Sequence, residues 1–312
     1  MSIELQFRSS ILSFFCESSK QNCVILWQQT GKIKMQTREH RLLKANDTIA
    51  QAFIKWGLIS NGDVITRNSS LLQPVIFDGM RATLKVALHD EERRGAALMA
   101  CWDGNGAAKV LKYDEDVLLL QLATGTKSLR QMVLGGNEDE ANKIICGVAA
   151  KLHNANCMTL AELTPLKLWF SDLGHAPAKY GGIFGECLNV ADQLLNDPRD
   201  IVALHGDIHY DNILDSGRGE WVAIDPKALL GERGFDFANL FCNPTPEIAL
   251  SETRLQRQAK LIALETGIDI KRLLQWILAW CGLCAAWTLD ERKDPYVQIA
   301  IAGYALKELA AF

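Results

Sequence analysis

The stretch that decides the fold of this protein is LHGDIHYDNIL, residues 204–214, which is followed by WVAID, ending at Asp225. Asp207 precedes Asn212 by five positions, and Asp225 ends a short apolar strand. Carboxylates that are brought together raise each other's pKa unless a cation neutralises them. Carboxylate and amide oxygens are hard ligands that suit Mg²⁺, which arrives with a phosphate chain. The pattern therefore predicts that Asn212 and Asp225 bind Mg²⁺ and that Asp207 is left to accept a hydroxyl proton.

A loop aspartate, an asparagine shortly after it and a strand-end aspartate carry phosphoryl transfer in protein kinases. The reaction asks the protein mainly to align its reactants and to cancel charge on the transferred group. Lys85, in the β-prone run TLKVAL, supplies a positive charge that can reach nucleotide phosphates. A strand lysine can also be an edge residue that extends its amine into solvent. The acidic residues downstream favour the phosphate-binding interpretation of Lys85.

The order of predicted elements places these groups in two lobes. Residues 64–123 predict a strand, a hairpin that turns at Asp78-Gly79, a helix and two further strands. After Gly125 helical periodicity dominates, with a helix start predicted at Thr164-Pro165 and a strand-and-loop segment at 201–225. We therefore predict an α+β fold whose two lobes enclose a cleft. The predicted parts are a peripheral N-terminal extension (1–34), a β-rich N-lobe (35–124) and a mainly helical C-lobe (125–312).

Composition argues against several classes of protein. Of the 312 residues, 48% are hydrophobic and 22% charged, and the net charge of −4 gives no sign of a nucleic-acid surface. The nine cysteines lie mostly in apolar runs, which predicts buried free thiols in a cytoplasmic protein. The motif CGLC at 281–284 has redox spacing but lies within a predicted apolar helix. The longest uncharged run, residues 273–289, is short for a membrane span, so we predict a buried core helix rather than a membrane protein.

HGDIHYDNIL and WVAIDPKALLGERGFDFANL resemble the aminoglycoside phosphotransferase (antibiotic kinase-like) family. The segments ERRGAALMACWDGNGAAKVL and LLQWILAWCGLCAAW add a resemblance to its streptomycin 6-phosphotransferase and hydroxyurea kinase branch, which covers most of residues 64–312. The resemblance implies a protein-kinase-like fold with ATP in the cleft. It assigns Asp207 as the catalytic base, Asn212 and Asp225 as Mg²⁺ ligands, and Lys85 to the α- and β-phosphates.

The resemblance also implies which acid orients the strand lysine. Glu92 aligns with that acid through its ERRGAAL context. Helical phase, in contrast, places Glu91 on the face that carries Leu98 and Trp102. The two assignments remain open on the sequence alone.

Two further segments are implied to contact the nucleotide. Ser69 and Ser70 stand where the family's nucleotide-covering loop lies, although no G-x-G-x-x-G pattern is present. The backbone from Gln121 to Ala123 is the expected adenine hinge. Many relatives carry a Glu-Arg-like pair there, whereas this chain has Gln121-Leu122, which leaves the choice between ATP and GTP open.

Other polar residues near the loop have two interpretations each. His205 and His209 flank an aspartate as zinc ligands can, but no further ligand is evident. The resemblance implies instead that His205 braces the loop and that His209 lies near the substrate. Asp236 is a surface acid or, as the resemblance implies, a buried acceptor for loop amides. Lys227 is a solvated charge or a group that approaches a phosphate.

We therefore expect an ATP- and Mg²⁺-dependent kinase that phosphorylates a hydroxyl of a small molecule. The resemblance favours a cationic aminoglycoside such as streptomycin, inactivated as an antibiotic, over hydroxyurea or another metabolite. Asp290 and Glu291 are solvated acids or an acidic rim for such a cation. An inactive nucleotide-binding interaction module would lack one of the four key residues, and all four are present. No nucleic-acid or membrane partner is expected, and the oligomeric state is left open.

Overall fold

The structure is a computed structural model that describes residues 38–160, 163–251 and 253–312. Of the first of its two units, which ends at Gln51, residues 38–51 are described and are helical. The predicted extension, residues 1–34, lies outside the described residues. Residues 52–312 form the second unit, which contains every predicted site residue.

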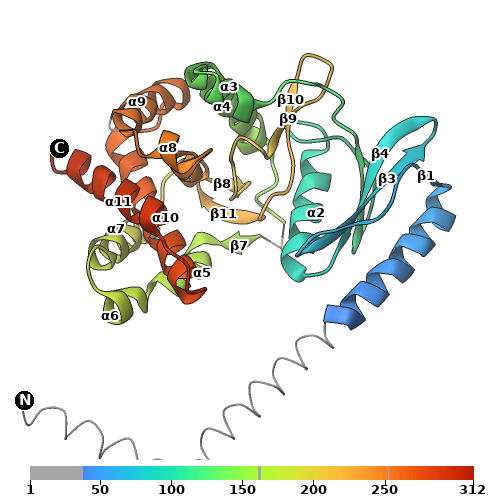
Figure 1. Cartoon of the computed structure of the whole chain (residues 1–312), viewed down its shortest axis with the longest axis horizontal. Helices are drawn as coiled ribbons and strands as arrows, with labels where there is room; N and C mark the ends of the chain where they lie inside the picture. The colour runs from blue at the N-terminus through green and yellow to red at the C-terminus, as the bar shows by residue number, and fades with distance from the viewer. Residues whose placement is uncertain (1–37, 161–162, 252) are drawn as a thin grey trace, which may run out of the picture. The chain divides into compact units, whose positions relative to one another are not determined.

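The second unit begins with an antiparallel sheet (Figure 1). Its central hairpin consists of β3 (Ser70–Phe77) and β4 (Met80–Ala87). Asp78 (φ 48°) and Gly79 (φ 74°) both adopt the left-handed conformation that a tight two-residue hairpin turn requires, so the predicted hairpin is confirmed. The strand order is β1-β3-β4-β6-β5, with β2 paired to β3. The other strands are β1 (Ile59–Ser60), β2 (Ile65–Thr66), β5 (Val110–Asp114) and β6 (Val117–Gln121).

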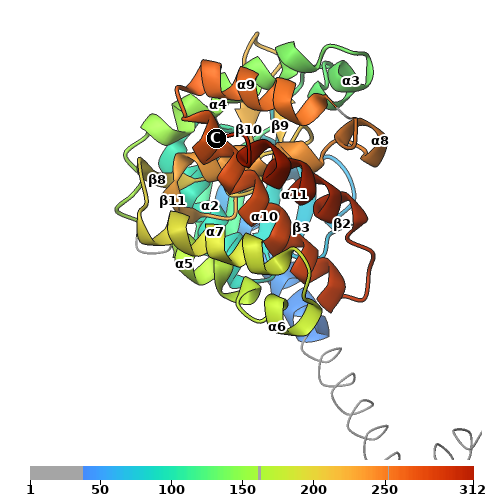
Figure 2. The ribbon, with the colours of Figure 1, turned by 90° about the vertical axis from the view of Figure 1, so that its left-hand side faces the viewer.

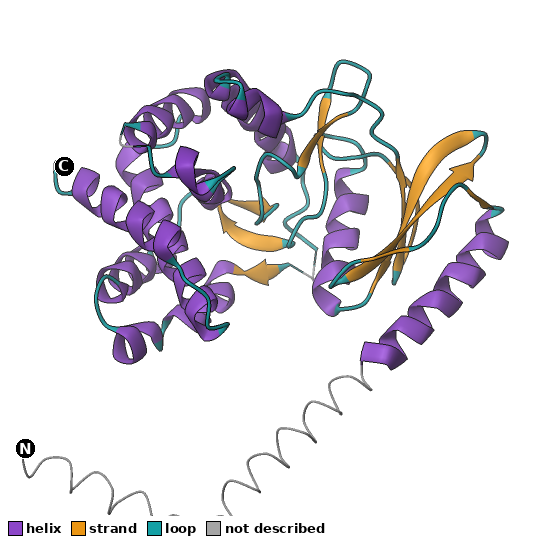
Figure 3. Ribbon diagram, viewed as in Figure 1, coloured by secondary structure: helices purple, strands orange, loops and turns teal. Residues whose placement is uncertain are grey.

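Helix α2 (Asp90–Trp102) lies between this sheet and the helical part of the unit (Figures 1 and 3). Its apolar residues Leu98, Met99 and Trp102 are buried in the main core together with Leu118 of β6. We call the sheet and α2 the β-rich lobe, and the elements that follow β6 the helical lobe. The predicted α+β architecture, with a β-rich part followed by a mainly helical part, is confirmed.

The helical lobe is organised around α10 (Ile270–Asp290), which packs against α7 and α11 (Figure 2). By length and composition α10 could cross a membrane, but 67% of its apolar window is buried inside the protein. The predicted core helix is therefore confirmed. The other helices are α3 (Leu129–Leu134), α4 (Glu138–Asn154), α5 (Leu166–Trp169), η2 (Phe170–Leu173), α6 (Ala176–Tyr180), α7 (Phe184–Asn196), η3 (Arg233–Cys242), α8 (Pro246–Ala249), α9 (Arg254–Thr266) and α11 (Tyr296–Leu309).

Two small sheets frame the segment 204–225. Strand β11 (Leu229–Glu232) lies between β8 (Ile201–Leu204) and β7 (Thr164–Pro165), while β9 (Ile213–Asp215) pairs with β10 (Trp221–Ala223). The predicted helix start at Thr164-Pro165 is placed one residue too early. These two residues pair with β11 as strand β7, and the helix begins at Leu166.

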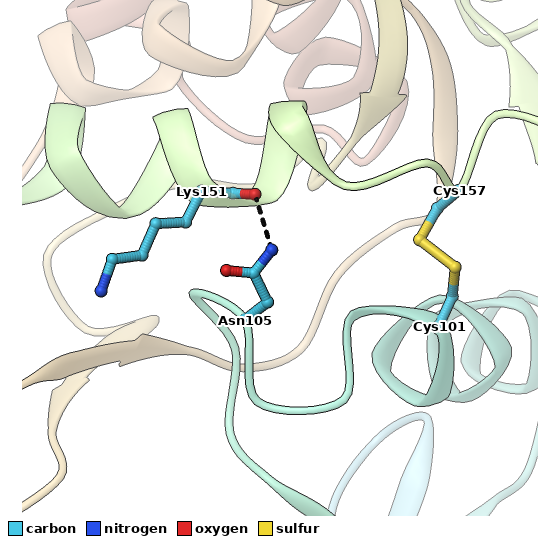
Figure 4. The surroundings of a disulfide bond; sticks show 4 residues. All are labelled: Cys101, Asn105, Lys151 and Cys157. Carbon is cyan, nitrogen blue, oxygen red and sulfur yellow. Dashed lines mark hydrogen bonds between the residues drawn. A yellow bond between two sulfur atoms is a disulfide. The ribbon is translucent and has the colours of Figure 1, made fainter.

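The prediction that the cysteines are free thiols is wrong for two of them. Cys101, near the end of α2, forms a disulfide with Cys157, which follows α4 (Figure 4). The two residues are separated by 56 positions, and only the packing of α2 beside the end of α4 brings their Cα atoms to 6.1 Å. The free cysteines of the described residues are Cys146, Cys187, Cys242, Cys281 and Cys284.

Candidate active site

The loop between β8 and β9 is held in place by a buried carboxylate. Asp236 of η3 is 2% exposed, and its two oxygens accept the backbone N–H groups of His205 (3.1 Å) and Gly206 (2.6 Å). The Nε2 atom of His153 lies 2.8 Å from the same carboxylate. Backbone groups buried away from water need such partners. The interpretation of Asp236 as a buried acceptor for the loop amides is confirmed.

His205 joins this loop to the segment after β10 that contains Ile224 and Asp225. Its Nε2–H donates to the carbonyl of Ile224 (2.8 Å), and its Nδ1 accepts the N–H of Asp207 (3.2 Å). The ring is fully buried and stacks on Trp102 of α2. Burial lowers the pKa of His205 to about 4, against an opposing effect of the Asp236 charge. The ring is therefore neutral and braces the loop. Its Nδ1, the atom that a second proton would occupy, accepts the hydrogen bond from Asp207.

Backbone hydrogen bonds bring the three predicted oxygen-bearing residues to one place. The N–H of Lys227 donates to His205 (2.7 Å) and the N–H of Ile224 donates to the carbonyl of Asn212 (3.0 Å). The side-chain amide of Asn212 donates to the carbonyl of Asp207 (2.9 Å), so its oxygen is left for another partner. Burial raises the pKa of Asp207, with the nearby Asp225 charge adding to the effect. A carboxylate with a raised pKa is a better proton acceptor.

Lys85 reaches this place from the β-rich lobe. It alternates along β4 with the buried Leu84 and Val86, so its side chain leaves the opposite face of the sheet. Its Nζ forms ion pairs with Asp225 and with Glu92 of α2, the latter at 2.5 Å. Burial would lower the pKa of Lys85, but the two carboxylates outweigh it and raise that pKa.

The two candidate acids of α2 have different partners. Glu92 is 7% exposed, pairs with Lys85 and accepts a hydrogen bond from the Ser69 hydroxyl (2.6 Å). Glu91 instead pairs with Lys227 at 2.8 Å, across the cleft. The helical-phase argument for Glu91 is therefore wrong, because it used the apolar face of α2, whereas the lysine meets the first turn of the helix.

A cavity of about 500 Å³ opens beside these ion pairs. Apolar side chains form most of its walls, and Lys85 and Asp225 also line it. Such a cavity suits an apolar ring system with a charged tail. The predicted residues that line it are Ser69, Ser70, Lys85, Gln121, Ala123 and Asp225.

The segment that follows β6 offers one unsatisfied donor to this cavity. The N–H groups of Gln121, Leu122, Thr124 and Gly125 all donate to carbonyls of the chain. Among the described residues, the N–H of Ala123 has no such acceptor. An N–H group without a partner beside an apolar cavity can donate a hydrogen bond to an acceptor on the edge of a bound base.

The remaining polar candidates form no additional site. Within the described ranges, no group of three or more His, Cys, Asp or Glu side chains is arranged to bind a metal ion, so the zinc interpretation of His205 and His209 finds no support. Asp290 already accepts hydrogen bonds from Lys179 (2.5 Å) and from the hydroxyl of Tyr180 (2.5 Å). These donors lower the pKa of Asp290 to about 2. Asp290 therefore links α10 to α6 through Lys179 and Tyr180.

This arrangement is typical of a protein-kinase-like phosphotransferase. A lysine of the β-rich lobe is held by a helix acid, and it faces two aspartates of the helical lobe, one in a braced loop and one after a short strand. The chain belongs to the aminoglycoside/hydroxyurea antibiotic resistance kinase family, whose model matches residues 55–292. It is a small-molecule kinase with a hydroxyl group as acceptor, as the sequence resemblance implied.

Relatives and solved structures agree with this membership. Streptomycin 3''-kinase of Klebsiella pneumoniae is 40% identical over 252 residues, which cover 79% of this chain and 94% of that protein. Streptomycin 6-kinase of Streptomyces griseus is 28% identical over 274 residues, 81% of this chain and 87% of that protein. The fold is similar to that of an aminoglycoside phosphotransferase solved with ADP and hygromycin B (TM-score 0.54, 12% identity, 82% of this chain and 97% of the other).

Two groups of the site were not predicted from the sequence. Asn239 of η3 contacts Asp207, and Glu91 pairs with Lys227 across the cleft. Both pairs are distant in the sequence, and no spacing rule connects their members. The three-residue offset between Asp236 and Asn239 on a helical turn was the one available signal.

Proposed function

We propose that the protein transfers the γ-phosphoryl group of ATP, in the presence of Mg²⁺, to a hydroxyl group of streptomycin. The observation that carries the proposal is the position of Lys85 between Glu92 and Asp225, next to the braced loop of Asp207. A catalytically inactive module would have no need for this set of charges. Each of them has a task in phosphoryl transfer.

The cavity fits the nucleotide. Its apolar walls suit a purine, the free N–H of Ala123 suits a ring nitrogen, and the Lys85 ammonium among its lining residues suits the α- and β-phosphates. Glu92 holds the lysine at this end and is itself held by the hydroxyl of Ser69. ATP is therefore the proposed donor.

The donor set also fits Mg²⁺. Asn212 uses its amide nitrogen inside the loop, which leaves its oxygen for a cation, and Asp225 supplies a carboxylate whose pKa Lys85 keeps low against the effect of burial. When bound, Mg²⁺ neutralises charge on the β- and γ-phosphates. The contribution of the chain is to hold these oxygens beside Lys85 before the nucleotide arrives.

Asp207 then acts on the acceptor. Its carboxylate accepts the proton of the substrate hydroxyl, or orients that oxygen, for in-line attack on the γ-phosphate. His205 fixes the backbone of Asp207, and Asp236 fixes the amides that precede it. Alignment of this kind accounts for much of the rate enhancement of such enzymes.

The proposed substrate comes from the relatives. The family description names aminoglycosides and hydroxyurea, and the relative at 40% identity acts on the 3'' position of streptomycin. We therefore propose streptomycin as the substrate and its 3''-hydroxyl as the acceptor. Hydroxyurea is the alternative substrate, because the family name includes it.

The test is a panel of reactions with Mg-ATP and streptomycin, other aminoglycosides or hydroxyurea, with products followed by mass spectrometry. We expect a gain of one phosphate on streptomycin and assignment of the modified hydroxyl by phosphorus NMR. Asp207→Ala should lower the rate by about 10²- to 10⁴-fold, the range for lost acid–base assistance, with ATP binding retained. Phosphorylation of hydroxyurea alone, or full activity of Asp207→Ala, would refute the substrate or the base respectively.

A further inference from the structure

One side chain outside the predicted set touches the carboxylate of the proposed base. The side-chain N–H of Asn239 donates to Oδ1 of Asp207 at 2.9 Å. Within the described part of the chain, Oδ2 of Asp207 accepts no hydrogen bond. One oxygen of the base is therefore engaged by the protein and the other is available to a substrate.

The orientation of the Asn239 amide is itself fixed. The side-chain amide of Asn243 donates to the Asn239 carbonyl (2.9 Å) and to Oδ1 of Asn239 (3.3 Å). With its oxygen turned toward Asn243, Asn239 presents its nitrogen to Asp207. The donor role of Asn239 thus follows from its second partner as well as from the distance to the carboxylate.

The segment that carries both asparagines is anchored by a buried ion pair. Arg254 of α9 is 3% exposed and donates to the carbonyls of Phe241 (2.9 Å) and Asn243 (2.7 Å). Glu138 of α4, also buried, accepts from Arg254 at 2.6 Å. Charge-assisted hydrogen bonds with several acceptors hold a segment in one geometry. The anchor therefore extends from α4 and α9 through Asn243 and Asn239 to Asp207.

We infer that Asn239 is a positioning residue for the base: it holds Oδ1 of Asp207 so that Oδ2 faces the acceptor hydroxyl. Without a hydrogen bond to its side chain, the carboxylate of Asp207 could rotate about its side-chain torsions even though its backbone is fixed. The hydrogen bond from Asn239 selects one orientation. Misplacement of a reacting group by about 1 Å can cost about 10²-fold in rate. The inference rests on the proposed role of Asp207, and the experiment separates the two.

The experiment measures kcat and KM for streptomycin and for ATP in Asn239→Ala. Loss of a hydrogen bond to a charged group predicts a kcat lower by about 10- to 100-fold. Because Asn239 contacts the base rather than the substrate, both KM values should change by less than about threefold. Asn105→Ala is the matched control: the side-chain amide of Asn105 also donates to one backbone carbonyl, that of Lys151 (Figure 4), and neither residue lines the cavity. Its kcat should equal that of the wild type.

A double-mutant cycle tests whether Asn239 acts through Asp207. Asp207→Ala/Asn239→Ala should be no slower than Asp207→Ala, because the group that Asn239 positions is gone. Asn239→Asp keeps the shape and removes the donor, so its kcat should fall at least as far, with a circular dichroism spectrum like that of the wild type. An unchanged kcat in Asn239→Asp, or additive losses in the double variant, would overturn the inference. Full activity of Asp207→Ala would instead remove the proposed base, whatever Asn239 does.

Discussion

The buried ring of His205 predicts how the stability of this protein depends on pH. In the folded protein burial lowers the pKa of His205 to about 4, from an ordinary value of 6.5. Between these two values the unfolded chain binds a proton at His205 that the folded chain does not. The free energy of unfolding therefore falls as the pH drops below 6.5, and this loss levels off below about pH 4. The stabilising contribution of the neutral ring is complete above the unfolded pKa. Acidification from pH 7 to pH 5 should remove about 2 kcal/mol from the free energy of unfolding through this residue alone.

The structure also gives the local reason. Protonation would place a hydrogen on Nδ1, which accepts the N–H of Asp207 at 3.2 Å, so two donors would face each other. The assay is equilibrium urea unfolding at several pH values for the wild type and for His205→Gln, which cannot titrate. The difference in free energy of unfolding between the two proteins should shrink by about 2 kcal/mol between pH 7 and pH 5. A difference that stays constant with pH, or a His205 ring that titrates near its ordinary pKa in NMR spectra, would refute the reasoning.

Three other predictions concern helix α2. A Cβ on Gly95 would lie 2.5 Å from the backbone oxygen of Pro226, so Gly95→Ala should lower the free energy of unfolding by about 1–3 kcal/mol and raise the KM for ATP. Gly147 has open space around it, so Gly147→Ala should leave both quantities unchanged, and equal behaviour of the two variants would contradict this reasoning. Cys101→Ser should lower the free energy of unfolding by about 2–4 kcal/mol without reductant and change little with reductant, as expected for a cross-link to Cys157 over 56 positions; the same loss in both buffers would argue against the disulfide. Glu92→Gln should raise the KM for ATP by about 10-fold, because a buried charge-assisted bond to the strand lysine is lost, and an unchanged KM would show that the lysine needs no acid.

Local patterns in the sequence predicted much of this site because its chemistry is concentrated in one short segment. Asp207 and Asn212 lie in one loop, and Asp225 follows β10, the hairpin partner of β9, so a few backbone hydrogen bonds suffice to bring them together. The same reasoning predicted the hairpin at Asp78-Gly79, where the turn itself demands a left-handed backbone. The length of the uncharged run 273–289 likewise predicted the buried α10, since a long apolar run too short for a membrane span is typical of a core helix.

The predictions that failed depend on contacts between distant segments. The disulfide between Cys101 and Cys157 requires the end of α2 to meet the end of α4, which no local pattern encodes. Thr164-Pro165 carries the signal of a helix start, but both residues pair with β11, far along the chain, and so form strand β7 directly before the helix. Asn239 could not be singled out, because its role depends on where η3 lies relative to the loop.

Helix α2 contacts the helical lobe along its whole length. Near its start, Glu91 pairs with Lys227; in its middle, Gly95 lies against the backbone of Pro226; and at its end Trp102 stacks on His205. All three partners belong to the loop between β8 and β9 or to the segment that follows Asp225. The helix therefore keeps a fixed register with the acids of the helical lobe, although its sequence position assigns it to the β-rich lobe. Since Glu92 lies on the same helix and pairs with Lys85, the position of this lysine is set from the loop between β8 and β9 as much as from its own strand.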